Sequence, residues 1–213
     1  MNGTSDFINQ HIHLIGIGGA GLSAIARVLL ERGAMVSGSD LVISPVAEEL
    51  ARDEALIFEG HDAENLRRCP RHPVDVVVVS SAVPENNVEI EAARAMGIPV
   101  LKRPAFLNHM MDGKQGVAVA GTHGKTTTTA MIAAILLRAE RDPTFIVGGV
   151  MANLKTNARA GAGPLFVIEA DEYDCTFLSL QPDLAVITNF EHDHPDCYPK
   201  FADFRTAFET LAA

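Results

Sequence analysis

Residues 11–21 read HIHLIGIGGAG, a short apolar run that breaks into closely spaced glycines. Residues 22–31 then show the apolar spacing of a helix. Strand, glycine loop and helix in this order open a Rossmann-like sheet, where glycines let the backbone approach a diphosphate and the helix directs its N-terminal amides at it. This stretch therefore predicts an α/β protein whose first loop is a candidate phosphate site.

Short strands and helices keep alternating up to about residue 111. Residues 74–79 are rich in valine and bounded by Pro73 and Ser80, as expected for a parallel strand buried on both faces. Further strands are expected at residues 34–38, 55–58 and 99–101, and helices at 45–52, 88–96 and 103–111. The prediction for residues 1–111 is a Rossmann-like domain with a doubly wound parallel sheet.

The same pattern restarts at Gln115 with the strand GVAVA, the loop GTHGKT and a helix expected at residues 127–139. Further strands are expected at 144–147, 165–169 and 184–188, a surface loop at 158–163, and a helix from about Phe201. Residues 112–213 are therefore predicted as a second α/β domain, of the P-loop type.

Composition limits the function classes. A formal net charge of -10 disfavours nucleic-acid binding, which is driven by cationic side chains. The first ten residues are polar and lack the features of a signal peptide, and no apolar stretch approaches the roughly 20 residues needed to cross a bilayer. Cys69, Cys175 and Cys197 form no CxxC pair, so neither a disulfide framework nor a zinc site is indicated. We expect a cytoplasmic protein without membrane insertion.

The first glycine loop has more than one interpretation. Gly16, Gly18 and Gly21 fit GxGxxG, and Asp40 follows about 20 residues later at a strand end, where a dinucleotide-binding protein holds a ribose. A nicotinamide-dependent oxidoreductase is therefore one alternative, and glycines that serve only a tight turn are another. We favour a bound diphosphate because a strand and a helix flank the loop.

The second loop, residues 121–126, is the stronger signal because it follows an apolar strand and opens a helix, as a nucleoside triphosphate loop requires. Lys125 can bring positive charge to the β and γ phosphates, and the Thr126 hydroxyl can coordinate Mg²⁺. The full Walker pattern has glycine where this chain has Val119, so the loop is a shortened variant. A chance GKT at a helix start is the alternative.

Two polar clusters follow later strands. Glu169 comes directly after residues 165–168 and is the candidate Mg²⁺ ligand, whereas a solvated acidic turn is the alternative, more so for Glu172. The second cluster, at residues 188–196, contains His192 and His194. A structural zinc site or a helix-capping histidine would explain it, but a Mg²⁺ and phosphate pocket fits the neighbouring loop better.

The stretches GTHGKTTT, EADEYD and TNFEHDH, in this order, resemble the Mur ligase family, which builds the peptide of bacterial cell-wall precursors by ATP-dependent amide formation. The resemblance covers essentially all 213 residues. The opening GIGGAGLSAIA, GSD at residues 38–40 and SSAVP at 80–84 look like the branch that joins L-alanine to UDP-N-acetylmuramate. The branch that recycles murein tripeptide usually opens with a GICGT-like loop, and folylpolyglutamate and cyanophycin synthetases are not expected to carry the first domain.

The resemblance implies a two-step reaction in which a carboxylate takes the γ-phosphoryl group of ATP and the alanine amine then displaces phosphate. It implies ATP and Mg²⁺ as cofactors, and it leaves a homodimer open. Its catalytic residues would be Lys125, Glu169 and His194, and its metal ligands Thr126, Glu169 and His194. ATP would lie on Gly121, Thr122, His123, Gly124, Lys125, Thr126 and Thr127. The UDP-sugar would lie on Gly18, Gly19, Ala20, Gly21, Ser39, Asp40, His61 and Ser81, with Asn189 at the central cleft.

Members of this family are much longer than this chain and carry a C-terminal Rossmann-like domain that completes the ATP site. We therefore expect weak or absent ligase turnover from residues 1–213 alone, with UDP-sugar binding preserved. Two rivals stay open: the nicotinamide-dependent oxidoreductase, which leaves GTHGKT unexplained, and a UDP-sugar-binding module without catalysis.

Overall fold

The computed structural model describes residues 7–68 and 72–212, and only the backbone of 174–176. The described residues up to Phe106 form one compact unit, and those from Leu107 onward form another. This division falls inside α4 (Arg103–Met111), whose end is the boundary expected from the sequence. Cys69 lies outside the described residues, so the structure does not test the prediction that it takes part in no disulfide or zinc site.

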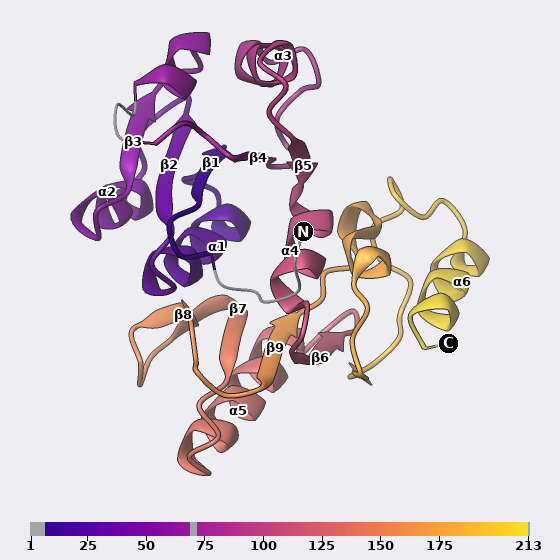
Figure 1. The fold of residues 1–213 in the computed structure, drawn as a ribbon. Coiled ribbons are helices and arrows are strands. Elements are labelled where there is room, and N and C mark those ends of the chain that lie inside the picture. Colours follow the sequence, from indigo (N-terminus) through magenta and orange to yellow (C-terminus); the bar gives the residue numbers. More distant parts are fainter. Residues whose placement is uncertain (1–6, 69–71, 213) are drawn as a thin grey trace. The chain divides into compact units, whose positions relative to one another are not determined.

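The first unit contains a five-stranded sheet in which every pair of neighbours is parallel. Its strands are β1 (His11–Ile15), β2 (Met35–Asp40), β3 (Leu56–Glu59), β4 (Val76–Val79) and β5 (Val100–Lys102), in the order β3-β2-β1-β4-β5 (Figure 1). The chain moves outward from β1 to β3 and then returns to the other side of β1. The order therefore reverses between β1 and β4, where ligands bind in sheets of this kind.

Helices and caps follow from local sequence. Helix α1 (Ala20–Glu31) buries one apolar face, and α2 (Pro45–Arg52) begins after Ser44, whose hydroxyl accepts a hydrogen bond from the Ala47 amide. Helix α3 (Val88–Ala95) is capped by Asn87. The short 3₁₀ helix η1 (Ala63–Arg67) was not predicted. The core on one side of the sheet consists of Ile15, Leu66, Val74, Val77, Val79, Ile90 and Ala93.

The second unit has its own five-stranded sheet, in the order β10-β6-β9-β7-β8. The strands are β6 (Gln115–Ala120), β7 (Thr144–Met151), β8 (Thr156–Arg159), β9 (Leu165–Glu169) and β10 (Leu184–Ile187), and only the β7–β8 pair is antiparallel. Helix α5 (Lys125–Arg138) packs against β6, β7 and β9 (Figure 1). The unit also contains η2 (Tyr173–Ser179) and α6 (Phe201–Leu211).

The predicted α/β class with parallel sheets is confirmed, but the surface loop predicted at residues 158–163 is wrong at its start. Ala158 is fully buried in β8, which forms a hairpin with β7. The four residues of β8, TNAR, carry no alternation that would reveal a strand, so the hairpin depends on pairing with β7. Among the described helices, none combines the length and apolarity needed to cross a bilayer.

Candidate functional site

The loop between β6 and α5 is held tightly by the segment that follows β10. Gly121 has a φ of +130°, and a Cβ there would collide with the Thr188 hydroxyl, so the position requires glycine. The His123 amide donates to Asn189 Oδ1 over 2.8 Å, and Thr188 Oγ1 donates to the His123 carbonyl over 2.6 Å. The helix begins immediately after Gly124, so its free amides face the loop as in phosphate-binding loops.

Lys125 is folded back onto its own loop and onto a buried carboxylate. Its Nζ donates to the Gly121 carbonyl over 2.7 Å and to Glu172 Oε1 over 2.8 Å. The Glu172 side chain is fully buried, and its Oε2 has no hydrogen-bond partner among the described residues. The alternative of a solvated acidic turn is therefore wrong for Glu172. The turn after β9 folds inward, where the Tyr198 hydroxyl donates to the Glu172 carbonyl over 2.7 Å.

Thr126 and Glu169 meet at the end of β9. Thr126 Oγ1 donates to Glu169 Oε1 over 2.9 Å, and the Gly148 amide donates to Glu169 Oε2 over 2.6 Å. A hydroxyl and a carboxylate side by side at a phosphate loop are oxygen ligands of the kind that Mg²⁺ prefers. The two residues predicted to share a metal are thus brought into direct contact.

His194 lies near the same carboxylate as Lys125. Its Nε2 is 3.6 Å from Glu172 Oε1, and the ligand atoms of Asp171, Glu172 and His194 all lie within 4.8 Å of one another. With the unpartnered Glu172 Oε2, these residues form a second donor set suited to a divalent cation. The His194 amide donates to Asp193, and this hydrogen bond holds the pKa of Asp193 below its ordinary value.

His192 does not join this group. Its Nε2 is 2.8 Å from the Tyr198 carbonyl, and its ring contacts Phe201 and Phe204 edge-on. The two histidines therefore have different environments, and the alternative of a zinc site that uses both is not supported by the geometry.

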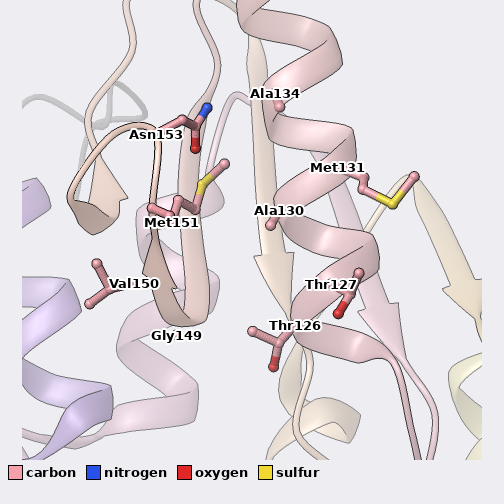
Figure 2. Close-up of a pocket in the computed structure, with 10 residues that line it drawn as sticks. Thr126, Thr127, Ala130, Met131, Ala134, Gly149, Val150, Met151 and Asn153 are labelled. Carbon is pink, nitrogen blue, oxygen red and sulfur yellow. The ribbon is translucent and has the colours of Figure 1, made fainter.

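A groove of about 380 Å³ begins beside the phosphate loop (Figure 2). Thr126, Thr127, Ala130, Met131 and Ala134 of α5 form one wall. The other wall comes from β7 and the turn after it, namely Gly149, Val150, Met151, Ala152 and Asn153. The walls are mostly apolar, and Met131 and Val150 are exposed. The threonines were predicted from the sequence as part of the ATP loop, but the groove was not predicted.

In the first unit, the glycine loop after β1 is tied to the end of β2. The Gly18 amide donates to Asp40 Oδ2 over 2.9 Å, and a Cβ at Gly18 would meet the same carboxylate. The Gly16 amide donates to the Ser39 carbonyl over 2.8 Å. Gly19 and Ala20 are exposed at the start of α1. The amides of residues 16–19 are therefore paired within this unit, and it is the first turn of α1, which has no side-chain cap, that leaves amides for a diphosphate.

Arg103 was missed by the sequence analysis. Its guanidinium lies against Gly21, where an added Cβ would meet Arg103 Nε at 2.7 Å. Arg103 directly follows β5, so its place at the carboxyl end of a strand is a signal that could have revealed it. Ser81 also follows a strand end, that of β4, and is exposed beside Ser80, whose Cβ would contact a side chain at Gly16.

Beneath this loop, a buried carboxylate gathers polar side chains from three elements. Glu89 of α3 is fully buried and accepts hydrogen bonds from Ser39 over 2.5 Å and Asn65 over 2.6 Å. His61 Nδ1 lies 3.2 Å from the same carboxylate, and His13 Nε2 lies 3.7 Å from it. Burial opposes ionisation of Glu89, but these hydrogen bonds and the nearby His13 together hold its pKa below the ordinary value.

The polar group continues along β1. Ser37 Oγ lies 2.7 Å from His11 Nε2 and 2.8 Å from His13 Nδ1, and all three residues are buried. Burial lowers the pKa of His11, because removal from water disfavours the charged imidazolium. This strand was predicted from the sequence only as an apolar strand. The alternation of His11 and His13 with apolar residues could have indicated a polar face.

The predicted residues thus fall into two groups. Gly18, Gly19, Ala20, Gly21, Ser39, Asp40, His61 and Ser81 gather in the first unit, and the loop residues with Glu169 and His194 gather in the second. Asn189 lies in the second unit, on the phosphate loop.

Known proteins resemble the chain over most of its length. Residues 11–115 match the catalytic domain of the Mur ligase family, and residues 119–213 match the Mur ligase middle domain. A UDP-N-acetylmuramate--L-alanine ligase from Chlorobium phaeovibrioides is 50% identical over 95% of this chain and 42% of its own length. One from Syntrophomonas wolfei is 48% identical over 92% of the chain and 42% of its length. The chain therefore spans about two fifths of these relatives.

Solved structures agree with the sequence relatives. A UDP-N-acetylmuramate:L-alanyl-gamma-D-glutamyl-meso-diaminopimelate ligase from Neisseria meningitides superposes with a TM-score of 0.85 at 34% identity, over 95% of this chain and 67% of that one. A UDP-N-acetylmuramate-alanine ligase from Thermotoga maritima gives 0.84 at 34% identity, over 96% and 47%. Together with the two phosphate loops, these matches show that the chain belongs to the Mur ligase family.

Proposed function

We propose that this chain is the nucleotide-sugar-binding and ATP-binding part of a ligase that joins L-alanine to the lactyl carboxylate of UDP-N-acetylmuramate in the cytoplasm. The observation that carries the proposal is the arrangement at the second loop. Lys125 is held by the buried Glu172, and Thr126 contacts Glu169 at 2.9 Å. Relatives at about 50% identity are named for this reaction.

We assign residues 1–111 to the UDP-sugar and residues 112–213 to ATP. In the first domain, the loop Gly18–Gly21 with the uncapped first-turn amides of α1, and the guanidinium of Arg103, would face the diphosphate, while Ser39, Asp40, His61 and Ser81 border the nucleoside. Backbone amides and the positive charge of Arg103 would hold the diphosphate at this site.

In the second domain, the residues would neutralise charge rather than react covalently. Lys125 would leave Glu172 to contact the β and γ phosphates, while the amides of 121–126 cradle their oxygens. Thr126 and Glu169, with His194 at a second position, would hold Mg²⁺, which neutralises phosphate charge when bound. The substrate carboxylate would then take the γ-phosphoryl group, and the amine of alanine would displace phosphate from the acyl phosphate.

Two measurements test this proposal. We expect calorimetric titrations to detect UDP-N-acetylmuramate and Mg-ATP binding by the chain, and Lys125→Ala to abolish only the ATP signal. Phosphate release is then measured with ATP, Mg²⁺, UDP-N-acetylmuramate and L-alanine, each omitted in turn. Release that needs all four would show that these residues suffice for turnover. A folded sample that binds neither nucleotide would contradict the proposal.

A second candidate substrate is the L-alanyl-γ-D-glutamyl-meso-diaminopimelate tripeptide, because the similar Neisseria structure is named for it. The same release assay with tripeptide in place of L-alanine separates the two reactions. We favour L-alanine because relatives that are 48% and 50% identical carry that name and the first loop reads GGAG. Greater release with the tripeptide would reverse this choice.

A further inference from the structure

The contacts of Glu89 determine where the hydrogens of its neighbours lie. Ser39 Oγ donates its only hydrogen to Glu89 Oε2, so the same oxygen can only accept from any other partner. His61 Nδ1 lies 3.0 Å from this Ser39 oxygen and 3.2 Å from Glu89 Oε2. Both atoms that face Nδ1 are therefore acceptors.

An imidazole nitrogen that faces two acceptors must carry a hydrogen. His61 is thus protonated on Nδ1, and in its neutral form its Nε2 is left with a free lone pair. No hydrogen bond of Nε2 occurs within the described part of the chain, and the side chain keeps 16% of its surface exposed. Nε2 is therefore an acceptor that a ligand can reach.

This acceptor belongs to the edge of the sheet where the glycine loop lies. Ser39 is the penultimate residue of β2, and its carbonyl accepts from the amides of Gly16 and Ile17 over 2.8 and 3.2 Å. Asp40, the next residue, accepts from the Gly18 amide. Ser39 thus orients His61 through its side chain and holds the glycine loop through its backbone.

We infer that Glu89 is a positioning residue of the nucleotide-sugar site: it locks His61 in the Nδ1–H tautomer, so that Nε2 accepts a hydrogen bond from an N–H or O–H group of the bound nucleoside. This inference rests on the proposed function, which supplies the ligand. In a uridine nucleotide, the matching donors are the uracil N3–H and the ribose hydroxyls. Cytosine presents an unprotonated N3, so an acceptor at this position would oppose it.

The burial of Glu89 suits this role. Its second oxygen accepts from Asn65 Nδ2 over 2.6 Å, so both oxygens are fixed by donors from different elements. Burial raises the pKa of Glu89, but hydrogen bonds and charge from His13, together with the hydrogen bonds from Ser39 and Asn65, hold it below the ordinary value. A charged acceptor restrains its donors more strongly than a neutral one does.

The tautomer is measured directly by two-bond ¹H–¹⁵N correlation spectra of the chain in mildly alkaline buffer, where imidazoles are neutral. His61 is assigned by comparison with His61→Gln. We expect an Nδ1-protonated ring with an unprotonated Nε2. Protonated Nε2 in the unliganded wild-type chain would overturn the inference, and this readout needs no variant at Glu89.

Glu89→Gln tests the positioning role. An amide at this position must turn its NH₂ group toward either Asn65 or the Ser39–His61 pair, which places donor against donor. We expect loss of the single tautomer and about tenfold weaker UDP binding, the effect of one hydrogen bond to a charged group. Glu91→Gln, at an exposed position on the same helix, is the matched control and should change neither. Unchanged tautomer and affinity in a folded Glu89→Gln would refute the role.

Ligand variants identify the donor. Titrations compare UDP with 3-methyl-UDP and CDP, which lack the N3–H, and with 2′-deoxy-UDP and 3′-deoxy-UDP, which each lack one hydroxyl. UDP should bind His61→Gln more weakly than it binds the wild type. The analogue that lacks the donor should show a smaller difference in affinity between the two proteins. If every analogue loses as much affinity in His61→Gln as UDP, the acceptor role is wrong. If UDP and UDP-N-acetylmuramate do not bind at all, the proposed function fails, while the tautomer result stands by itself.

Discussion

At the scale of single residues, Gly148 decides where Glu169 can lie. Its amide donates to Glu169 Oε2 over 2.6 Å, and a Cβ at this position would lie 2.6 Å from both carboxylate oxygens. The carboxylate is the far end of a flexible side chain, so it can turn away while the backbone of β7 stays in place. Any side chain at Gly148 would therefore separate Glu169 from Thr126.

We expect Gly148→Ala to fold but to bind Mg-ATP about 10- to 100-fold more weakly, since loss of a hydrogen bond to a charged group, here that of Thr126 to Glu169, costs about 1.5–3 kcal/mol. Calorimetric titration of ATP, with Mg²⁺ and with EDTA, measures the effect, which should be larger with Mg²⁺. Gly149→Ala is the control, because a Cβ there would touch only the Thr126 methyl group, at 3.3 Å. Equal losses in the two variants would show that Glu169 is not the cause.

Other residues of the two sites differ in how far the sequence reveals them. Lys125, Thr126 and Glu169 were predicted because each follows a strand within a recognisable pattern. Glu172, Glu89 and Arg103 were missed because their partners are distant in sequence: Glu172 meets Lys125 across 47 positions, and Glu89 meets Ser39 across 50. Only the folded sheet brings such charges together, and no local spacing encodes them.

At the scale of elements, β1 contains a buried histidine, His11, that makes the stability of the fold depend on pH. Burial lowers the pKa of His11, so the folded state favours the neutral ring. As the pH falls below the ordinary value near 6.5, the unfolded chain takes up a proton before the folded chain does. The stability contributed by neutral His11 is therefore present above this pH and is lost as the pH falls through the lowered pKa.

We expect His11→Gln to flatten the pH dependence of the melting temperature on the acid side of pH 6.5. Glutamine can still reach Ser37 but has no proton to gain. Scanning calorimetry over a pH series provides the measurement, with His72→Gln, at an exposed side chain, as the control. His13 and Asp75 also face His11 and are retained in both variants. A slope identical to that of the wild type would rule out His11 as its source.

Elements were predictable where local signals were strong. The valines of β4 and the apolar positions of α1 specify buried elements by themselves, and both were expected. Strand β8 and the helices η1 and η2 were missed, because a four-residue edge strand and short 3₁₀ turns are stabilised by their neighbours rather than by their own residues.

At the scale of the whole molecule, each unit has its own sheet, its own core and its own candidate ligand loop. The first has a parallel sheet, a core that includes Ile15, Val77 and Ile90, and the glycine loop. The second has another sheet, a core that includes Phe145 and Val167, and the phosphate loop. Binding of a ligand to one site should therefore stabilise only the unit that contains this site, because the ligand shifts only the unfolding equilibrium of that unit.

Hydrogen exchange with peptide resolution tests this independence. At a ligand concentration about 100-fold above its Kd, binding adds about 2.7 kcal/mol to the free energy of unfolding of the liganded unit. Amides that exchange when this unit opens should therefore exchange about 100-fold more slowly. We expect UDP-N-acetylmuramate to protect peptides from residues 7–106 and Mg-ATP to protect those from 107–212. Lys125→Ala should remove only the second effect. If UDP-N-acetylmuramate protected both units equally, the two units would unfold as one cooperative body. Ligand binding to one unit would then stabilise the other unit as well.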